Sequence, residues 1–169
     1  MADAPIYTSN RGEEGFVPSK FLVCVDESEV SRIALRFACI KAKKRGFRVE
    51  MLHVIPPGEV QALNMIADKM YEEQLEEAEH FTRALAADME EHLGMSPDII
   101  IRHGNVGDEI LEQLKADQEA NMLVFGVSTN RSSSAKLISW VAGQMGEDLM
   151  IPVMLVPGTL TDQQMMEVS

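Results

Sequence analysis

Short, very apolar runs alternate with longer segments of helical periodicity along most of this 169-residue sequence. Each run is too short for a helix, and a run that is apolar on both faces is typical of a strand buried in a parallel sheet. The runs are residues 21–25, 49–55, 99–101, 122–125 and 152–156. The alternation predicts an α/β fold, with right-handed crossovers and helices on both faces of the sheet.

The segments between the runs have the periodicity of helices. The first helix is expected to follow Ser28, a good N-cap residue, and to stop at Gly46. The others are expected at about residues 68–93, 106–117 and about 134–148. The long helix should turn Tyr71, Leu75, Ala78, Thr82, Leu85 and Met89 inward, and the last should turn Leu137, Ile138, Val141, Ala142 and Met145 inward.

The two ends of the sequence have no such pattern. Residues 1–18 indicate a flexible leader, and residues 158–169 indicate a loose C-terminal tail. A single domain is therefore expected over residues 19–157, since no linker interrupts them.

Charge excludes some partners. The sequence has 15 basic and 27 acidic residues, a net charge of −12, which disfavours nucleic acid and anionic membrane surfaces. Nine of the acids lie in the segment 68–93, where they indicate a solvated helix face. No apolar run is long enough to span a bilayer and no signal core is present, so a cytoplasmic protein with reduced Cys24 and Cys39 is expected.

In a parallel sheet, ligands bind at the carboxyl ends of strands where the strand order reverses. Here the expected strand ends are Asp26 and the polar loop after Gly126. A strand followed by a polar loop and a helix can direct backbone N–H groups at an anion.

Several ordered motifs make this sequence resemble the universal stress protein family. They are Phe21 to Glu29, Leu52 to Pro56, Gly104 to Val106, Val124 to Gly126 and Ile151 to Val156. The resemblance covers about residues 19–157. It implies a five-stranded parallel sheet in the order 3-2-1-4-5, of the Rossmann-like, adenine nucleotide alpha-hydrolase-like type. It also implies a homodimer formed through the fifth strand (153–156) and a role in stress survival without a defined catalytic reaction.

ATP-binding members of that family have three glycines after the fourth strand, with the third followed by Ser or Thr. Aligned on this motif, the sequence has Gly126, then Thr129 and Ser139 in place of the other two glycines, and Trp140 after them. A glycine allows positive φ and lets the backbone approach phosphate, whereas a β-branched residue resists that conformation. The departures place this chain with members in which ATP binding is weak or absent, and no cofactor is expected.

An alternative stays open. The segment between Gly126 and Gly146 has no acidic residue, but has Arg131 and Lys136, so side chains could hold a phosphate in place of bare backbone. Asp26 and Val54 match family positions that contact the nucleoside. The candidate nucleotide-binding residues, for ATP with Mg²⁺ or for ADP or AMP, are then Asp26, Val54, Gly126, Ser128, Thr129, Arg131 and Ser139.

Catalytic and metal-binding patterns are absent from the sequence. It has no nucleophile and base in a recognisable order, no phosphate-loop lysine motif and no Cys/His spacing for a metal. The expected protein is thus not an enzyme, and acts through an unidentified protein partner. A slow ATPase or nucleotide-binding switch that uses the loop after Gly126 is the alternative.

Overall fold

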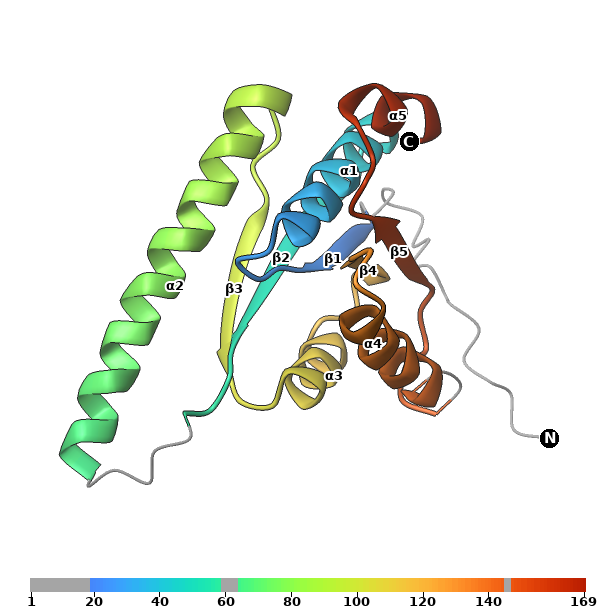
Figure 1. Ribbon diagram of the computed structural model, residues 1–169. Coiled ribbons are helices and arrows are strands. Elements are labelled where there is room, and N and C mark those ends of the chain that lie inside the picture. The colour runs from blue at the N-terminus through green and yellow to red at the C-terminus, as the bar shows by residue number, and fades with distance from the viewer. Residues whose placement is uncertain (1–18, 59–63, 145–146) are drawn as a thin grey trace, which may run out of the picture.

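The computed structural model describes residues 19–58, 64–144 and 147–169, and gives the backbone alone for residues 64–67 and 131–134. Its strands are β1 (Lys20–Cys24), β2 (Arg48–Ile55), β3 (Asp98–His103), β4 (Ala120–Val127) and β5 (Val153–Pro157). All neighbouring strands are parallel, and their order is β3-β2-β1-β4-β5 (Figure 1). The predicted fold class and strand order are confirmed.

The helices are α1 (Glu29–Arg45), α2 (Asn64–Leu93), α3 (Val106–Ala116), α4 (Arg131–Gln144) and α5 (Asp162–Val168). Two apolar clusters show that they cover both faces of the sheet. One cluster joins strand residues such as Val23 and Met51 to α1, α2 and α5, and the other joins Leu22 and Leu123 to α3 and α4. Because adjacent strand residues such as Leu22 and Val23 point to opposite faces, the central strands are apolar on both faces over most of their length.

The ends of α1 are fixed by the residues that the sequence indicated. Ser28 is the N-cap, and its side chain accepts a hydrogen bond from the Ser31 N–H at 3.3 Å. Gly46 ends the helix in the left-handed region, with φ of 70°. Helix α1 thus leaves the carboxyl end of β1 at a defined place, which matters for the site below.

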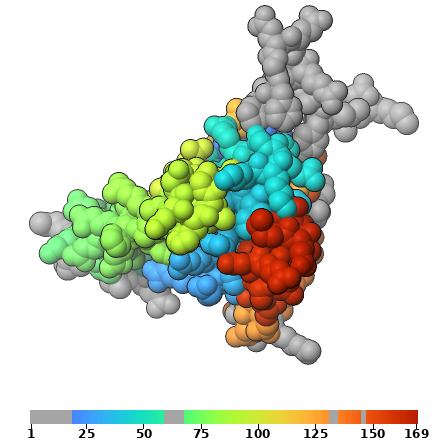
Figure 2. Space-filling model, turned by 90° about the horizontal axis from the view of Figure 1, so that it is seen from above, coloured from blue at the N-terminus to red at the C-terminus, as the bar shows by residue number. Residues whose placement is uncertain are grey.

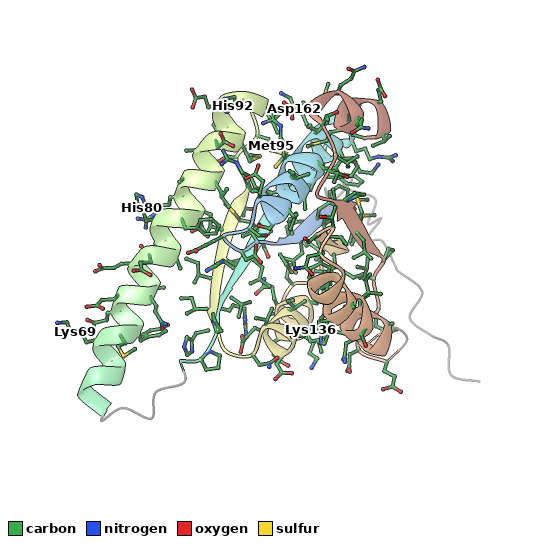
Figure 3. The ribbon with its side chains drawn as sticks, in the orientation of Figure 1. Lys69, His80, His92, Met95, Lys136 and Asp162 are labelled. Atoms are coloured by element: carbon green, nitrogen blue, oxygen red, sulfur yellow. The ribbon has the colours of Figure 1, made fainter. Side chains whose placement is uncertain are left out.

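Helix α2 is 30 residues long, and its first turns extend beyond the carboxyl end of β3 (Figure 1). Ala78, Thr82, Leu85 and Met89 are buried as expected. The expectation for Tyr71 is wrong: it is 42% exposed and packs edge-on against His103. The reason is that Tyr71 lies on the part of α2 that leaves the sheet. On the opposite side, Lys69 and His80 extend away from the sheet, on the acidic face of the helix (Figure 3).

Helix α4 and strand β4 differ from the expected bounds. β4 continues through Gly126 to Val127, and α4 begins at Arg131 and ends at Gln144. Val141 is buried and Leu137 half-buried, whereas Ile138 and Ala142 are exposed, which corrects the wider apolar stripe that was expected. Only a narrow strip of α4 therefore faces the sheet. Met145, also expected on that stripe, lies outside the described residues, as does the leader 1–18.

The expected loose tail is wrong for residues 162–168, which form α5. Thr161 and Gln164 make a capping box at its start, and Met165 is only 2% exposed within the core cluster of α1. Arg36 pairs with Asp162 at 3.0 Å, and Lys44 Nζ donates to the Met166 carbonyl oxygen at 2.9 Å. Figure 2 shows α5 (red) lying against α1 (blue to cyan). One buried methionine and two polar contacts thus hold α5 in place.

A buried polar group joins β1, β2 and α3. Lys20 Nζ lies 2.8 Å from Glu50 Oε2 and pairs with Asp117, and Gln113 Nε2 donates to Glu50 Oε1 at 2.9 Å. Burial lowers the pKa of Lys20, but hydrogen bonds to Asp117 and Glu50 and the attraction of these carboxylates outweigh it. The pKa therefore lies above its ordinary 10.5. Lys20 is charged and paired at neutral pH.

Both cysteines are free thiols, as expected. Burial raises the pKa of Cys39 from 9.0 to about 12. Over residues 19–58, 64–144 and 147–169, no helix is both long and apolar enough to cross a bilayer.

Candidate functional site

A cleft of about 500 Å³ opens at the carboxyl end of the sheet, between the starts of α1 and α3. This is where the strand order predicts a ligand site, because crossovers on the two sides of β1 run to opposite faces of the sheet. The lining residues come from every element that meets there. They are Cys24, Val25, Asp26, Ser28, Glu29, Val30, Ser31, Leu52, Val54, Val106, Ile110, Phe125, Gly126, Ser128 and Leu137.

The inner surface of the cleft is apolar. Leu52 and Phe125 are buried strand residues with side chains in the α3 and α4 cluster, and Val54 is half-buried beside them. Burial raises the pKa of the Cys24 thiol far above its ordinary 9.0, and the neighbouring Asp26 carboxylate raises it further. Cys24 is therefore a neutral thiol, and it adds no charge to this surface.

Polar groups on the α1 side of the cleft bond mainly to one another. The Asp26 carboxylate accepts hydrogen bonds from the Ser28 N–H, at 2.9 Å, and from the Ser28 hydroxyl. The Ser31 hydroxyl accepts from the Asp26 N–H at 3.1 Å and lies 2.7 Å from the Asp26 carbonyl oxygen. This is the turn that a strand-end Asp forms with nearby backbone N–H groups. It holds Asp26 at the cleft with its carboxylate exposed.

The α3 side is built in a similar way. The Asn105 side chain accepts from the N–H groups of Gly107 and Asp108, at 3.1 and 3.3 Å, and so caps the helix. The next residue, Val106, lines the cleft and is 47% exposed. Ile110, one turn later, is buried below it. This wall therefore presents hydrocarbon, and the Asn105 side chain already accepts hydrogen bonds from the Gly107 and Asp108 N–H groups at the helix start.

Gly126 is at the cleft for a packing reason. A Cβ placed there would lie 2.2 Å from the Val30 carbonyl oxygen, so β4 and the start of α1 touch backbone to backbone. Two residues on, the Ser128 hydroxyl accepts from the Asn130 N–H at 3.0 Å in a local turn before α4. Among the described residues, no residue other than glycine has a positive φ, so Thr129 has a negative φ like the others.

The structure brings together part of the predicted site. Four of the predicted residues line the cleft described above, namely Asp26, Val54, Gly126 and Ser128, whereas Thr129 is exposed and does not line it. Ser139 lies in the middle of α4, where it lines a separate shallow depression with Ala135, Lys136 and Trp140. Arg131 is the first residue of α4, and its side chain lies outside the described part.

Trp140 takes up space near α3 instead of leaving it open. Its indole packs edge-on against Phe125, with ring centroids 6.3 Å apart. It also lies over Gly107, where an added Cβ would be 2.5 Å from Nε1. The residue aligned with a phosphate-binding hydroxyl is thus a packing residue between α3 and α4.

Sequence reasoning missed several lining residues, above all Glu29 and Val106. Each comes directly after a helix N-cap, Ser28 and Asn105, that follows a strand end. Both residues could have been predicted from this position, because the first turn of a helix that follows a strand end borders the carboxyl edge of the sheet. Among the described residues, no three His, Cys, Asp or Glu side chains come close enough to hold a metal ion.

A five-stranded, doubly wound parallel sheet with a cleft at its strand ends defines a Rossmann-like α/β fold. The pattern of the Universal stress protein family matches residues 19–157. The chain belongs to the universal stress protein family.

Solved structures of universal stress proteins share this fold. Universal stress protein UspA from Lactobacillus plantarum has a TM-score of 0.68 and 16% identity, covering 82% of this chain and 97% of that chain. A family protein from Arabidopsis thaliana with AMP bound has a TM-score of 0.55 and 18% identity, covering 83% and 92%. One from Archaeoglobus fulgidus in complex with dAMP has a TM-score of 0.58 and 19% identity, covering 83% and 98%. No curated protein sequence matches this chain.

Proposed function

We propose that this chain is a non-catalytic, cytoplasmic universal stress protein that acts through contact with a protein partner and binds ATP weakly or not at all. The supporting observation is that the three positions of the glycine motif do not form one phosphate-binding loop. Gly126 is explained by its contact with Val30. Thr129 has no positive φ, and Ser139 lies in the middle of α4. A triphosphate needs several backbone N–H groups converging on it, and these positions do not converge.

Calorimetry with ATP and Mg²⁺ tests the proposal. No heat is expected at millimolar nucleotide, and native mass spectrometry of the purified protein should show the mass of the polypeptide alone. ATP or ADP that co-purifies in a one-to-one ratio would contradict the proposal.

A nucleotide-binding switch or slow ATPase is the second candidate, and one observation favours it. Asp26, Val54, Gly126 and Ser128 line the same cleft, although β1 and β4 are far apart in sequence. Two relatives of the same fold are described with AMP and dAMP. This candidate expects ATP, ADP or AMP binding that Arg131→Ala weakens, and turnover of ATP if it is an ATPase. Binding that is unchanged in Arg131→Ala would count against it.

We also propose a homodimer through β5. This strand pairs with β4 on one side, and its other side has no strand partner among the described residues. Leu155 in its middle is 39% exposed, and an apolar strand edge favours pairing with another strand.

Light scattering tests the dimer. The protein should have the mass of two chains, and Leu155→Glu should shift it toward one chain. Val168→Glu, at an exposed position on α5, is the matched control and should leave the mass unchanged. A single-chain mass for the unmodified protein would contradict the dimer.

A further inference from the structure

We propose that the groove between α2 and the outer edge of β3 binds an extended, basic segment of a partner protein, which adds to the sheet as a further strand. This inference rests on the proposed function, because it assigns a surface and a chemistry to the partner contact. It concerns the edge of the sheet opposite to β5 and does not involve the cleft at the strand ends.

The first support is the backbone of β3. This strand pairs with β2 on one side, and its other side has no strand partner among the described residues. The Gly104 N–H donates to the Ile55 carbonyl oxygen on β2 at 3.0 Å, and successive residues of a parallel strand direct their backbone groups to alternate sides. The backbone N–H and carbonyl groups of Ile99 and Ile101 therefore point away from β2, where an added strand would bond to them.

The middle of β3 also lacks the features that commonly prevent strand addition. Edge strands are often protected by Lys, by Pro or by a bulge. The middle of β3 is instead three successive isoleucines, residues 99–101, and its pairing with β2 has no shift of register. The three side chains are only half-buried, so this edge is apolar and accessible.

A groove lies beside this edge, and we call it the edge groove. It has a volume of about 470 Å³ and is lined by Leu75, Glu79, Thr82, Arg83, Ile99 and Ile101. Figure 1 shows α2 running along β3 at the margin of the sheet. In strand addition, hydrogen bonds to a strand edge give affinity, and pockets that take alternate side chains give specificity. The edge of β3 and the edge groove supply both.

The charge of α2 indicates the character of the partner segment. Glu79 lines the edge groove and pairs with Arg83 at 2.9 Å. Glu72 and Glu76 lie on the same side of the helix, about two turns and one turn before Glu79, and both are exposed. The helix wall of the edge groove thus has more acid than base, which favours Lys or Arg on the added segment.

The same charge disfavours a second copy of this chain as the added strand. Pairing of two β3 edges would place two α2 helices beside the joint, and each has nine acidic and two basic residues. Like charges at such a joint repel each other. A basic segment of another protein meets attraction at the same place, so it is the occupant that we propose.

Fluorescence anisotropy with a synthetic probe tests the inference. The probe is a fluorescein-labelled peptide of about ten residues, in which Val or Ile alternates with Lys or Thr. We expect saturable binding to the full chain. The same peptide with Glu in place of Lys should bind about tenfold or more weakly, and added salt should reduce this difference. A version N-methylated at alternate residues should also lose about tenfold or more, because it cannot bond to the edge.

A proline variant tests the role of the strand edge. Ile101→Pro removes an N–H that points outward and leaves the hydrogen bonds to β2 in place, as proline on an edge strand can. It should weaken the probe about tenfold or more while circular dichroism stays unchanged. Ile101→Val keeps the N–H and most of the side chain, and it should bind the probe as the unmodified protein does.

Charge reversal on α2 tests the helix wall and does not depend on the proline variant. Glu72→Lys with Glu76→Lys should weaken the Lys probe about tenfold or more and strengthen the Glu probe. Glu73→Lys with Glu77→Lys changes the net charge equally. These two residues lie about one turn from Lys69 and His80, on the side of α2 that points away from the sheet, so both probes should bind as before (Figure 3).

The outcomes distinguish this inference from the proposed function. No binding of the Lys probe, or binding that neither Ile101→Pro nor the Glu72 and Glu76 variant weakens, would overturn the inference and leave a partner contact elsewhere on the surface. Tight ATP binding would overturn the proposed function without changing the result at β3. A mass in light scattering that falls in Ile101→Pro would show pairing with a second copy, which would also overturn the inference.

Discussion

Gly126 and Val30 are in backbone contact: a Cβ on Gly126 would lie 2.2 Å from the Val30 carbonyl oxygen. Gly126 is also the one glycine that remains of the family's ATP motif in this chain. Its presence is explained by the packing of α1 on β4, with no ligand required. A retained motif residue is therefore weak evidence for a retained ligand here.

Gly126→Ala should destabilise the protein by about 3 kcal/mol, because backbone, and not a side-chain end, must move to admit the methyl group. Gly143→Ala is the matched control. Gly143 is in α4 with open space around its missing Cβ, so alanine should stabilise by about 0.5–1 kcal/mol through helix propensity. Urea unfolding measures both, and equal effects would contradict the contact.

Met165→Ala should lower the free energy of unfolding by about 2–4 kcal/mol, since Met165 is buried in the core against α1. The neighbouring Met166 is 56% exposed, and Met166→Ala should change stability by less than about 0.5 kcal/mol. Hydrogen exchange of residues 162–168 should rise in the first variant only. Similar exchange in both variants would show that α5 does not depend on Met165.

Lys20→Met should lower the free energy of unfolding by about 3–5 kcal/mol at neutral pH, because Glu50 would remain buried without its cation. Adding Glu50→Gln should recover much of this loss, since Gln113 can still hydrogen-bond to that position and no lone charge is left. Chemical denaturation of the single and double variants measures the coupling free energy between Lys20 and Glu50. A double variant as unstable as Lys20→Met would mean that lost packing, and not the unpaired charge, causes the effect.

Stability should fall as the pH rises above 9.0, the ordinary pKa of a thiol. Between pH 9.0 and pH 10.5, folded Cys39 keeps a proton that the unfolded chain loses, because its folded pKa is about 12. Each such thiol lowers the free energy of unfolding by about 1.4 kcal/mol per pH unit over this interval. Lys20 contributes in the same direction only above its ordinary pKa of 10.5.

The variant Cys39→Ala checks this pH dependence. Its unfolding free energy should fall less steeply over the same pH interval, by about 1.4 kcal/mol per unit, whatever its stability at neutral pH. Parallel curves for the variant and the unmodified protein would show that Cys39 is not protected from ionisation in the folded state.

The fold followed from the sequence because its signals are local and repeated. Strand residues such as Leu22 and Val23 are apolar on both faces, and caps such as Ser28 and Gly46 mark helix ends. Helix α5 was missed since seven residues with one buried methionine give almost no periodicity. Tyr71 has the spacing of a core residue, and only the extension of α2 beyond β3 makes it exposed.

The site was predicted less completely, for a different physical reason. Asp26 follows the end of β1 and Gly126 lies near the end of β4, and the rule for ligand position in parallel sheets places both at one edge. The contact of Gly126 with Val30 joins segments far apart in sequence, so no local pattern could reveal it. Likewise, Ser139 aligns with a glycine and falls inside the helix expected from the sequence, but only the packing of α4 in the fold shows that Ser139 faces a separate depression.

The acidic face of α2 makes the molecule electrically uneven from one edge of the sheet to the other. Nine acidic and two basic residues, a balance of −7, stand on the helix beside β3, whereas α4 has no acidic residue. Two copies that diffuse toward each other are repelled most when their α2 helices face, over a screening length of about 8 Å at physiological salt. Encounters are thereby oriented toward the sides that carry α4 and β5, before any contact forms.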